Sequence, residues 1–276
     1  MPLESSSAAR PTFSIVIPAY NEAARIRSTL ETIRDYAART HRPLEVIVVD
    51  DGSTDTTADI VRQFLPADAA GRTPSGSEGP LPRPEGRSTC PVHLLVNDRN
   101  RGKGFAVRRG MLEARGDFIL MCDADLSAPI DELEKLRPWI ERGCDIVIGS
   151  RDLPDSVLDP PQPLARRLMA WTFRAIRRRL LLPHIRDTQC GFKLFRCDAA
   201  RETFSRATED GWLFDCEALA LAERLGYRIQ EVGLRWRDMP GSRVHPLREA
   251  LRALPTLLRI RRRIRSVDYA NAEIRR

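Results

Sequence analysis

Five short apolar runs, separated by stretches with helical periodicity, constrain the fold of this 276-residue chain more than any other feature. The runs lie at residues 13–17, 44–49, 93–96, 118–122 and 145–148. Each is almost continuously apolar, which is typical of strands that are buried on both faces of a sheet. Strands that alternate with helices predict an α/β domain with a mostly parallel sheet and helices on both of its faces. The composition, 42% hydrophobic and 30% charged, is that of an ordinary globular protein.

The polar loops of this half of the chain directly follow the predicted strands. They lie at residues 18–22, 50–55, 99–104 and 123–127. In a parallel sheet the carboxyl ends of the strands share one edge, and ligands of such sheets bind beyond that edge. We therefore expect the four loops to converge on one ligand site.

The segment Asp123-Ala124-Asp125 ends the apolar run 118–122. Two carboxylates one residue apart offer oxygen ligands to a hard divalent cation such as Mg²⁺ or Mn²⁺. A cation held there can neutralise a diphosphate leaving group. Aspartates also end strands and cap helices for structural reasons, so the triplet alone leaves both interpretations open.

Two other loops have the composition of a nucleotide site. Asp50 and Asp51 can accept hydrogen bonds from a base or ribose, or they can cap a turn. Residues 100–104, Asn-Arg-Gly-Lys-Gly, open a predicted helix whose backbone amides can face a phosphate or a base. They lack the GxxxxGK[ST] spacing of a phosphate loop, and an ordinary helix-initiating turn is the alternative.

The net charge of +7 comes from basic residues that are almost all arginine. Arginine suits bidentate contacts with phosphate, and a positive balance also permits an anionic membrane or nucleic acid. The basic residues follow the acidic loops instead of alternating with aromatic residues, so we expect no nucleic-acid partner. Six cysteines without a CxxC pair, and no signal-like N-terminus, predict a reducing, cytoplasmic location. No apolar run approaches the roughly 20 residues that span a bilayer, so contact with a membrane is expected from its surface.

Composition also predicts the domain boundaries. We expect a disordered leader at residues 1–11, one domain over 12–245 with a flexible insertion at 66–91, and a basic amphipathic helix and tail at 246–276. A second basic helix is predicted at 164–182.

The predicted C-terminal helix has leucines near one face and arginines around them. The leucines are Leu247, Leu251, Leu254 and Leu258, with Arg262 near the same face. Such a helix can lie in the headgroup plane of an anionic membrane. The alternative is a helix packed on the domain with a solvated basic rim.

The motifs IVIPAYNE (15–22), VVDDGSTD (48–55), NRGKG (100–104) and DADLS (123–127) together resemble family 2 glycosyltransferases of the GT-A fold. In the second half, IRDTQCGFKLF (185–195), GWLFDCEAL (211–219) and PGSRVHP (240–246) are similar to dolichyl-phosphate glucosyltransferases. The dolichyl-phosphate mannosyltransferases are a more distant match. The resemblance covers roughly residues 13–260.

This resemblance implies roles for individual residues. Around the base and ribose of a nucleotide sugar it would place Pro18, Tyr20, Glu22, Asp51, Gly102 and Lys103. Asp123 and Asp125 would serve the diphosphate and the metal, with Asp125 as the direct ligand. Near the phosphates of donor or acceptor it would place Arg151, Gln189, Lys193 and Arg243. For Arg151, Lys193 and Arg243, taken as isolated residues, solvated surface charge is the alternative. Asp215 would be the catalytic carboxylate, as a base or a positioning group. Ser127 stands where the mannosyltransferases usually have Gln, which leaves the third metal ligand open.

The acceptor decides the mechanism. A hydroxyl acceptor requires a general base, whereas a polyprenyl phosphate is already an anionic nucleophile and needs cationic positioning. The arginines and lysine of the second half favour the phosphate. We therefore expect an inverting, metal-dependent transfer of glucose from UDP-glucose to a polyprenyl phosphate, peripheral to the cytoplasmic face of a membrane. The alternatives are another donor such as GDP-mannose, a hydroxyl acceptor, or a nucleotide-sugar binder without catalysis.

Overall fold

The computed structural model describes residues 11–66, 90–159, 173–237 and 246–266, and for 246–252 it describes the backbone alone. The predicted leader, nearly all of the predicted insertion, Arg243 and the C-terminal tail lie outside these residues.

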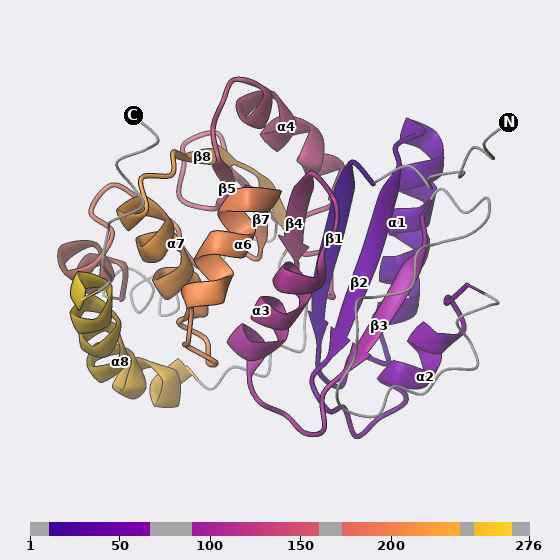
Figure 1. The fold of residues 1–276 in the computed structure, drawn as a ribbon, viewed down its shortest axis with the longest axis horizontal. Coiled ribbons are helices and arrows are strands. Elements are labelled where there is room, and N and C mark those ends of the chain that lie inside the picture. Colours follow the sequence, from indigo (N-terminus) through magenta and orange to yellow (C-terminus); the bar gives the residue numbers. More distant parts are fainter. Residues whose placement is uncertain (1–10, 67–89, 160–172, 238–245, 267–276) are drawn as a thin grey trace, which may run out of the picture.

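A seven-stranded sheet forms the centre of the molecule, with the strand order β3-β2-β1-β4-β7-β5-β8 (Figure 1). Its strands are β1 (Phe13–Ala19), β2 (Leu44–Asp50), β3 (Val92–Val96), β4 (Phe118–Cys122), β5 (Ile146–Ser150), β7 (Phe192–Arg196) and β8 (Ile229–Gly233). Neighbouring strands are parallel except where β7 pairs with β4 and β5, to both of which it is antiparallel. A separate parallel ladder joins β6 (Val157–Asp159) to β9 (Arg235–Arg237). The expected mostly parallel α/β sheet is confirmed.

Helices cover both faces of this sheet. They are α1 (Ile26–Thr40), α2 (Thr57–Arg62), α3 (Lys103–Glu113), the 3₁₀ helix η1 (Ile130–Glu132), α4 (Leu133–Glu141), α6 (Cys197–Arg206), α7 (Phe214–Arg224) and α8 (Pro246–Ser266). Residues 173–180 are also helical, which agrees with the described part of the helix predicted at 164–182.

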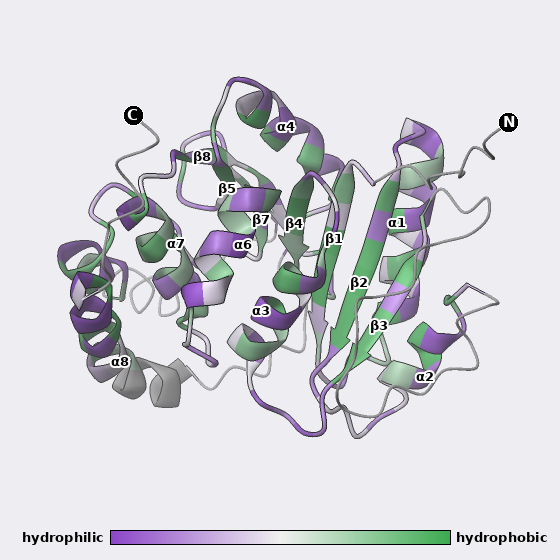
Figure 2. Ribbon diagram, in the orientation of Figure 1, coloured by the Kyte–Doolittle hydropathy of each residue, from purple (hydrophilic) through white to green (hydrophobic). Residues whose placement is uncertain are grey.

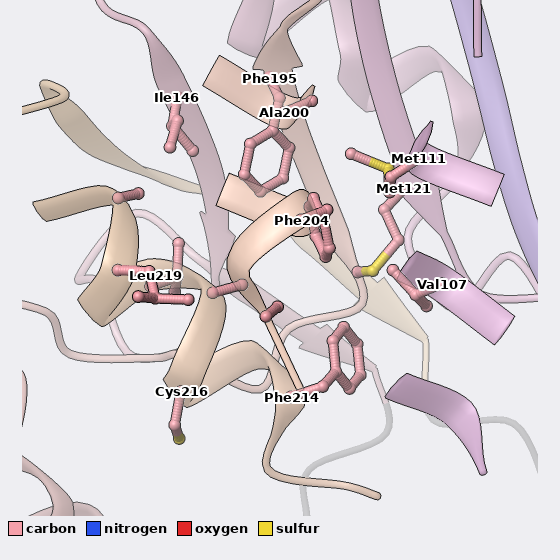
Figure 3. Packing of buried hydrophobic residues seen from close by; sticks show 14 of the residues in the cluster. Val107, Met111, Met121, Ile146, Phe195, Ala200, Phe204, Phe214, Cys216 and Leu219 are labelled. Carbon is pink, nitrogen blue, oxygen red and sulfur yellow. The ribbon is translucent and has the colours of Figure 1, made fainter. Parts of the chain in front are cut away.

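Alternation along the strands divides the core into two apolar clusters. In β1, Val16 belongs to the cluster under α3, α6 and α7, whereas Ile15 and Ile17 belong to the cluster under α1, α2 and α4. Figure 3 shows part of the first cluster, in which Met111 of α3 and Met121 of β4 lie together. Because both faces are covered, the central strands are mostly hydrophobic (Figure 2).

The loops at the carboxyl ends of the parallel strands meet, as expected. The amide of Asn21 donates to Oγ of Ser53 at 2.8 Å, which joins the loops after β1 and β2. The hydroxyl of Thr29 in α1 donates to the carbonyl oxygen of Ala124 at 2.6 Å, which ties the loop after β4 to the same edge. The loops are polar in Figure 2, in contrast to the strands they follow.

The C-terminal helix α8 packs against α7. Its buried side chains are Ala253, Leu257, Ile260 and Ile264. At its end, Arg263 pairs with the buried carboxylate of Glu217 in α7 at 2.8 Å. Among the described residues, no helix combines the length and the apolar character needed to cross a membrane.

Candidate active site

The two carboxylates after β4 lie in a tight turn. The backbone of Leu126 has a φ of 46°, a left-handed conformation that is uncommon for a bulky residue. This turn brings the amide and the hydroxyl of Ser127 to Oδ1 of Asp125, at 3.0 and 2.9 Å. Ser127 therefore orients the Asp125 carboxylate.

Each of the two carboxylates has a cation beside it. Lys103 Nζ lies 2.6 Å from Oδ1 of Asp123, and Arg25 lies 3.8 Å from Oδ2 of Asp125. Burial favours a lower pKa for Lys103, but the carboxylates of Asp123 and Asp215 outweigh it and raise the pKa, so the side chain is cationic. The turn thus has two negative charges balanced by two positive ones.

Asp123 and Asp125 fit a divalent cation whose remaining ligands come from a substrate. Both carboxylates are partly exposed, so their oxygens are accessible. The described residues contain no group of three or more His, Cys, Asp or Glu side chains that could enclose a metal. Mg²⁺ in proteins is commonly bound by one or two carboxylates together with substrate phosphates and water, and the two carboxylates are the part of this donor set that the chain supplies.

The loop after β2 uses its carboxylates within the protein. Asp51 accepts hydrogen bonds from Nδ2 of Asn97 at 2.7 Å and from the amide of Gly102 at 2.8 Å. Asp50 accepts from the amide and hydroxyl of Ser53. Both aspartates are buried; Asp50 braces the loop after β2, and Asp51 ties this loop to the start of α3. A contact between Asp51 and a base or ribose stays a prediction.

The sequence leaves two interpretations open for residues 100–104, a turn that binds phosphate or base and an ordinary helix-initiating turn. In the structure the amide of Gly102 donates to Asp51 and that of Gly104 donates to the carbonyl oxygen of Asp210 at 2.8 Å, which agrees with the second. These amides are occupied because α3 lies directly against the segment before α7, so closely that a Cβ on Gly104 would overlap it. Lys103 reaches the site through its side chain instead.

The predicted nucleotide residues Pro18, Tyr20 and Glu22 lie at the end of β1 and in the loop that follows. The carboxylate of Glu22 accepts a hydrogen bond from Nε of Arg25 at 2.8 Å. Because Arg25 also approaches Asp125, this loop is linked electrostatically to the carboxylate turn. The nucleotide-binding roles of these residues remain predictions.

Asp215 and Lys193 form a buried ion pair. Asp215 lies in the first turn of α7, and its Oδ1 is 2.6 Å from Nζ of Lys193, whose side chain is only 2% exposed. The Lys193 ammonium also donates to the carbonyl oxygen of Cys190. Burial raises the pKa of Asp215 above its ordinary value, although Lys193 and Lys103 act against this. Lys193 is therefore a buried partner of the candidate catalytic carboxylate and not a solvated surface charge.

Arg151 is likewise engaged by the protein. Its guanidinium donates to both oxygens of Asp187, at 2.7 and 3.0 Å, and stacks over Trp236 with 4.9 Å to the ring centroid. Burial acts to raise the pKa of Asp187, but Arg151 outweighs it and holds the pKa well below its usual range. The backbone amide of Gln189 donates to the same carboxylate at 3.0 Å. Arg151, Asp187 and Gln189 thus form one rigid unit next to β5 and β7.

Three structural features of the site went unrecognised in the sequence. Gly191 lies so close to Asp123 that a Cβ there would be 2.7 Å from Oδ1 and closer still to the other carboxylate oxygen. Trp212 stands beside Lys103, and Asp187 is the partner of Arg151. All three lie within the strings 185–195 and 211–219, whose resemblance to dolichyl-phosphate glucosyltransferases does not by itself assign a role to Gly191, Trp212 or Asp187.

Comparison with known proteins identifies the family of this chain. The model of the family described as "Glycosyl transferase family 2" matches residues 14–204. The chain belongs to glycosyl transferase family 2. The dolichyl-phosphate beta-glucosyltransferase of Dictyostelium discoideum is 34% identical over 258 residues, which cover 90% of this chain and 73% of that protein. The Homo sapiens protein of the same name is 32% identical, over 91% of this chain and 75% of its own length. The chain is thus a glycosyltransferase similar to dolichyl-phosphate beta-glucosyltransferases.

Solved structures agree on the GT-A fold of this family 2 member. Glucosyl-3-phosphoglycerate synthase from Mycobacterium tuberculosis, in complex with Mn²⁺, UDP and glucosyl-3-phosphoglycerate, has a TM-score of 0.58 and 20% identity. The match covers 91% of this chain and 80% of that one. The same enzyme in complex with Mn²⁺, UDP-glucose and glycerol 3-phosphate gives a TM-score of 0.58 at 19% identity. At these identities the likeness establishes the fold alone.

Proposed function

We propose that this family 2 glycosyltransferase transfers glucose from UDP-glucose to a polyprenyl phosphate, with inversion at the anomeric carbon. The observation on which this depends most is the similarity to dolichyl-phosphate beta-glucosyltransferases over about nine tenths of the chain. The Mn²⁺ and UDP-glucose complexes of the structural neighbour are consistent with the donor and with the metal.

Asp123 and Asp125 would hold Mg²⁺ or Mn²⁺, which when bound offsets the charge that develops on the departing diphosphate. Lys103 lies beside Asp123 and is cationic, so its ammonium can bind the same diphosphate. Ser127 keeps the Asp125 carboxylate in one orientation. These residues serve the donor half of the reaction.

The acceptor half requires a nucleophile on the opposite side of the anomeric carbon. A phosphate oxygen of the acceptor forms the new bond to this carbon while the bond from the carbon to the oxygen of UDP breaks. The phosphate is already ionised near neutral pH, so no side chain has to remove a proton. Asp215 is paired with the buried Lys193, and in this reaction the pair positions groups instead of shuttling protons. With a hydroxyl acceptor, Asp215, whose pKa is raised, would be the base.

A donor screen tests this proposal. Purified protein is incubated with polyprenyl phosphate, Mn²⁺ and radiolabelled UDP-glucose or GDP-mannose, and the lipid product is extracted into organic solvent. We expect label in the organic phase from UDP-glucose, and its loss in the Asp125→Asn variant. Label from GDP-mannose alone would show that the donor is not UDP-glucose. Label that stays in an aqueous glycan would show that the acceptor is not a polyprenyl phosphate.

The protein is also proposed to meet its lipid acceptor at the cytoplasmic surface of an anionic membrane through α8. Leu254 is 48% exposed on a flank of α8 beside its buried residues, and Leu258 and Arg262 are exposed with it. An apolar strip with arginines around it suits the headgroup region of an anionic bilayer. The packing of α8 on α7 therefore leaves Leu254, Leu258 and Arg262 of the predicted membrane face exposed, whereas the side chains of Leu247 and Leu251 lie outside what the structure describes.

Sedimentation with anionic liposomes tests this surface. Wild-type protein should sediment with the vesicles and be released by high salt, which screens exposed charges. The double variant Leu254→Gln/Leu258→Gln should stay in solution. Leu112→Gln, which changes an equally exposed leucine on α3, is the matched control and should still sediment. If the Leu254→Gln/Leu258→Gln variant sediments with the vesicles as well as Leu112→Gln does, α8 is not the membrane-binding surface.

A further inference from the structure

A large aromatic side chain stands exposed at the edge of the site. Trp212 is 40% exposed, although its neighbours Leu213 and Phe214 are buried. The residue precedes α7 and lies three positions before Asp215. Exposing an indole to water sacrifices the stabilisation that its burial would give, so an exposed tryptophan at a functional edge is a candidate ligand contact.

The exposure of Trp212 does not come from a loosely held loop. Oε2 of the buried Glu217 accepts the amides of Thr208 and Glu209, at 2.7 and 2.6 Å. Beyond them, the carbonyl oxygen of Asp210 accepts the amide of Gly104 at 2.8 Å. The segment before Trp212 is therefore fixed on both α7 and α3, and the indole is presented from a rigid support.

The indole shares a neighbour, the ammonium of Lys103, with the carboxylate that is expected to serve the diphosphate. Lys103 Nζ lies 5.0 Å from the ring centroid of Trp212 and 2.6 Å from Oδ1 of Asp123. In a nucleotide sugar the pyranose follows the second phosphate directly. Because Lys103 lies beside both the indole and Asp123, the indole is within reach of a pyranose whose diphosphate is bound at Asp123. The C–H face of a pyranose is apolar and packs well on an indole.

We propose that Trp212 is the aromatic wall of the sugar subsite and contributes to the recognition of the transferred pyranose. This inference rests on the proposed function, because it takes the donor to be a nucleotide sugar. It assigns to Trp212 a positioning role, in which the indole supports one face of the sugar while Asp123 and Lys103 hold the diphosphate.

The test compares the affinities for UDP and for UDP-glucose by calorimetry in the presence of Mn²⁺. Trp212→Ala should weaken the binding of UDP-glucose by about tenfold and leave the binding of UDP unchanged, because only the sugar contacts the indole. Trp212→Phe should retain most of the affinity for UDP-glucose. An equal loss for both ligands, or no loss for either, would overturn the inference.

Tryptophan fluorescence gives a second readout that does not depend on turnover. UDP-glucose should change the emission of the wild type and of Trp139→Phe, in which a partly buried tryptophan of α4 is replaced. The change should vanish in Trp212→Phe, and its persistence there would count against the inference. If the wild type binds UDP-glucose and Trp212→Ala binds it equally well, this inference alone fails. If the wild type binds neither UDP-glucose nor GDP-mannose, the proposed function fails and the sugar subsite with it.

Discussion

Replacing Gly191 by alanine should disable the carboxylate turn while leaving the fold intact. The added Cβ would lie 2.7 Å from Oδ1 of Asp123 and closer to the rest of the carboxylate, whereas ordinary contacts begin at 3.4 Å. The carboxylate must therefore move by roughly 1 Å or more, which disturbs its ion pair with Lys103. A displacement of about 1 Å at a reacting centre can cost about 100-fold in rate, which corresponds to ~2.7 kcal/mol of barrier.

The assays for Gly191→Ala are turnover and calorimetric binding of Mn²⁺ with UDP, and the control is Gly110→Ala. In the control the new Cβ would lie 2.5 Å from Val16 and 2.9 Å from Val49, in the core under α3. Both variants should lose about 1–3 kcal/mol of stability from overpacking. We expect the loss of Mn²⁺–UDP affinity and the drop in turnover in Gly191→Ala alone. Equal turnover in the two variants at matched folded fraction would refute the reasoning.

Three further predictions follow from the site and the core. Asp125→Asn should lower turnover by about 100-fold or more, because the amide lacks the charge that attracts a hard cation. The urea midpoint of this variant should be unchanged. Full turnover of the variant in the presence of chelator would contradict the prediction. Lys193→Met should lower the free energy of unfolding, measured with urea, by about 3–5 kcal/mol because it leaves Asp215 buried without its partner. Adding Asp215→Asn should restore part of this stability. Strictly additive losses in the double variant would argue against the ion pair. Burial lowers the pKa of His93 below 6.5, so the unfolded chain binds a proton more readily and stability should fall as the pH drops from about 7 to about 5. His93→Gln should flatten this part of the profile of melting temperature against pH, and an identical profile would remove His93 as its cause.

Much of the donor side could be predicted from the sequence because its residues follow apolar runs directly. The runs ending near Ala19, Asp50 and Cys122 are strands, and the loops after them meet at one edge. Their meeting follows from the parallel direction that α/β alternation implies. The side-chain partners within the loops did not follow, since the Asp51 carboxylate is satisfied by the distant Asn97 and by backbone amides.

The part of the site around β7 was less accessible to sequence reasoning because β7 is antiparallel to its neighbours. This reversal places Phe192 opposite Cys122 and Lys193 opposite Met121, which brings Gly191 against Asp123. Hydrophobic pattern gives the existence of a strand and not its direction. The ion pairs of Lys193 with Asp215 and of Arg151 with Asp187 join distant parts of the chain. The sequence therefore indicated that Lys193 and Arg151 are charged but could not predict their partners.

The most direct test of the proposed acceptor compares a polyprenyl phosphate with the polyprenol of the same chain length. Each is offered to the wild-type protein with Mn²⁺ and radiolabelled UDP-glucose, and the labelled lipid is quantified across pH 5.5–8.5 (about the range in which a phosphate monoester loses its second proton). The account predicts labelled lipid from the phosphate alone, with Asp215→Asn keeping measurable turnover because no proton has to be removed. Glucosylation of the polyprenol, abolished by Asp215→Asn, would contradict it.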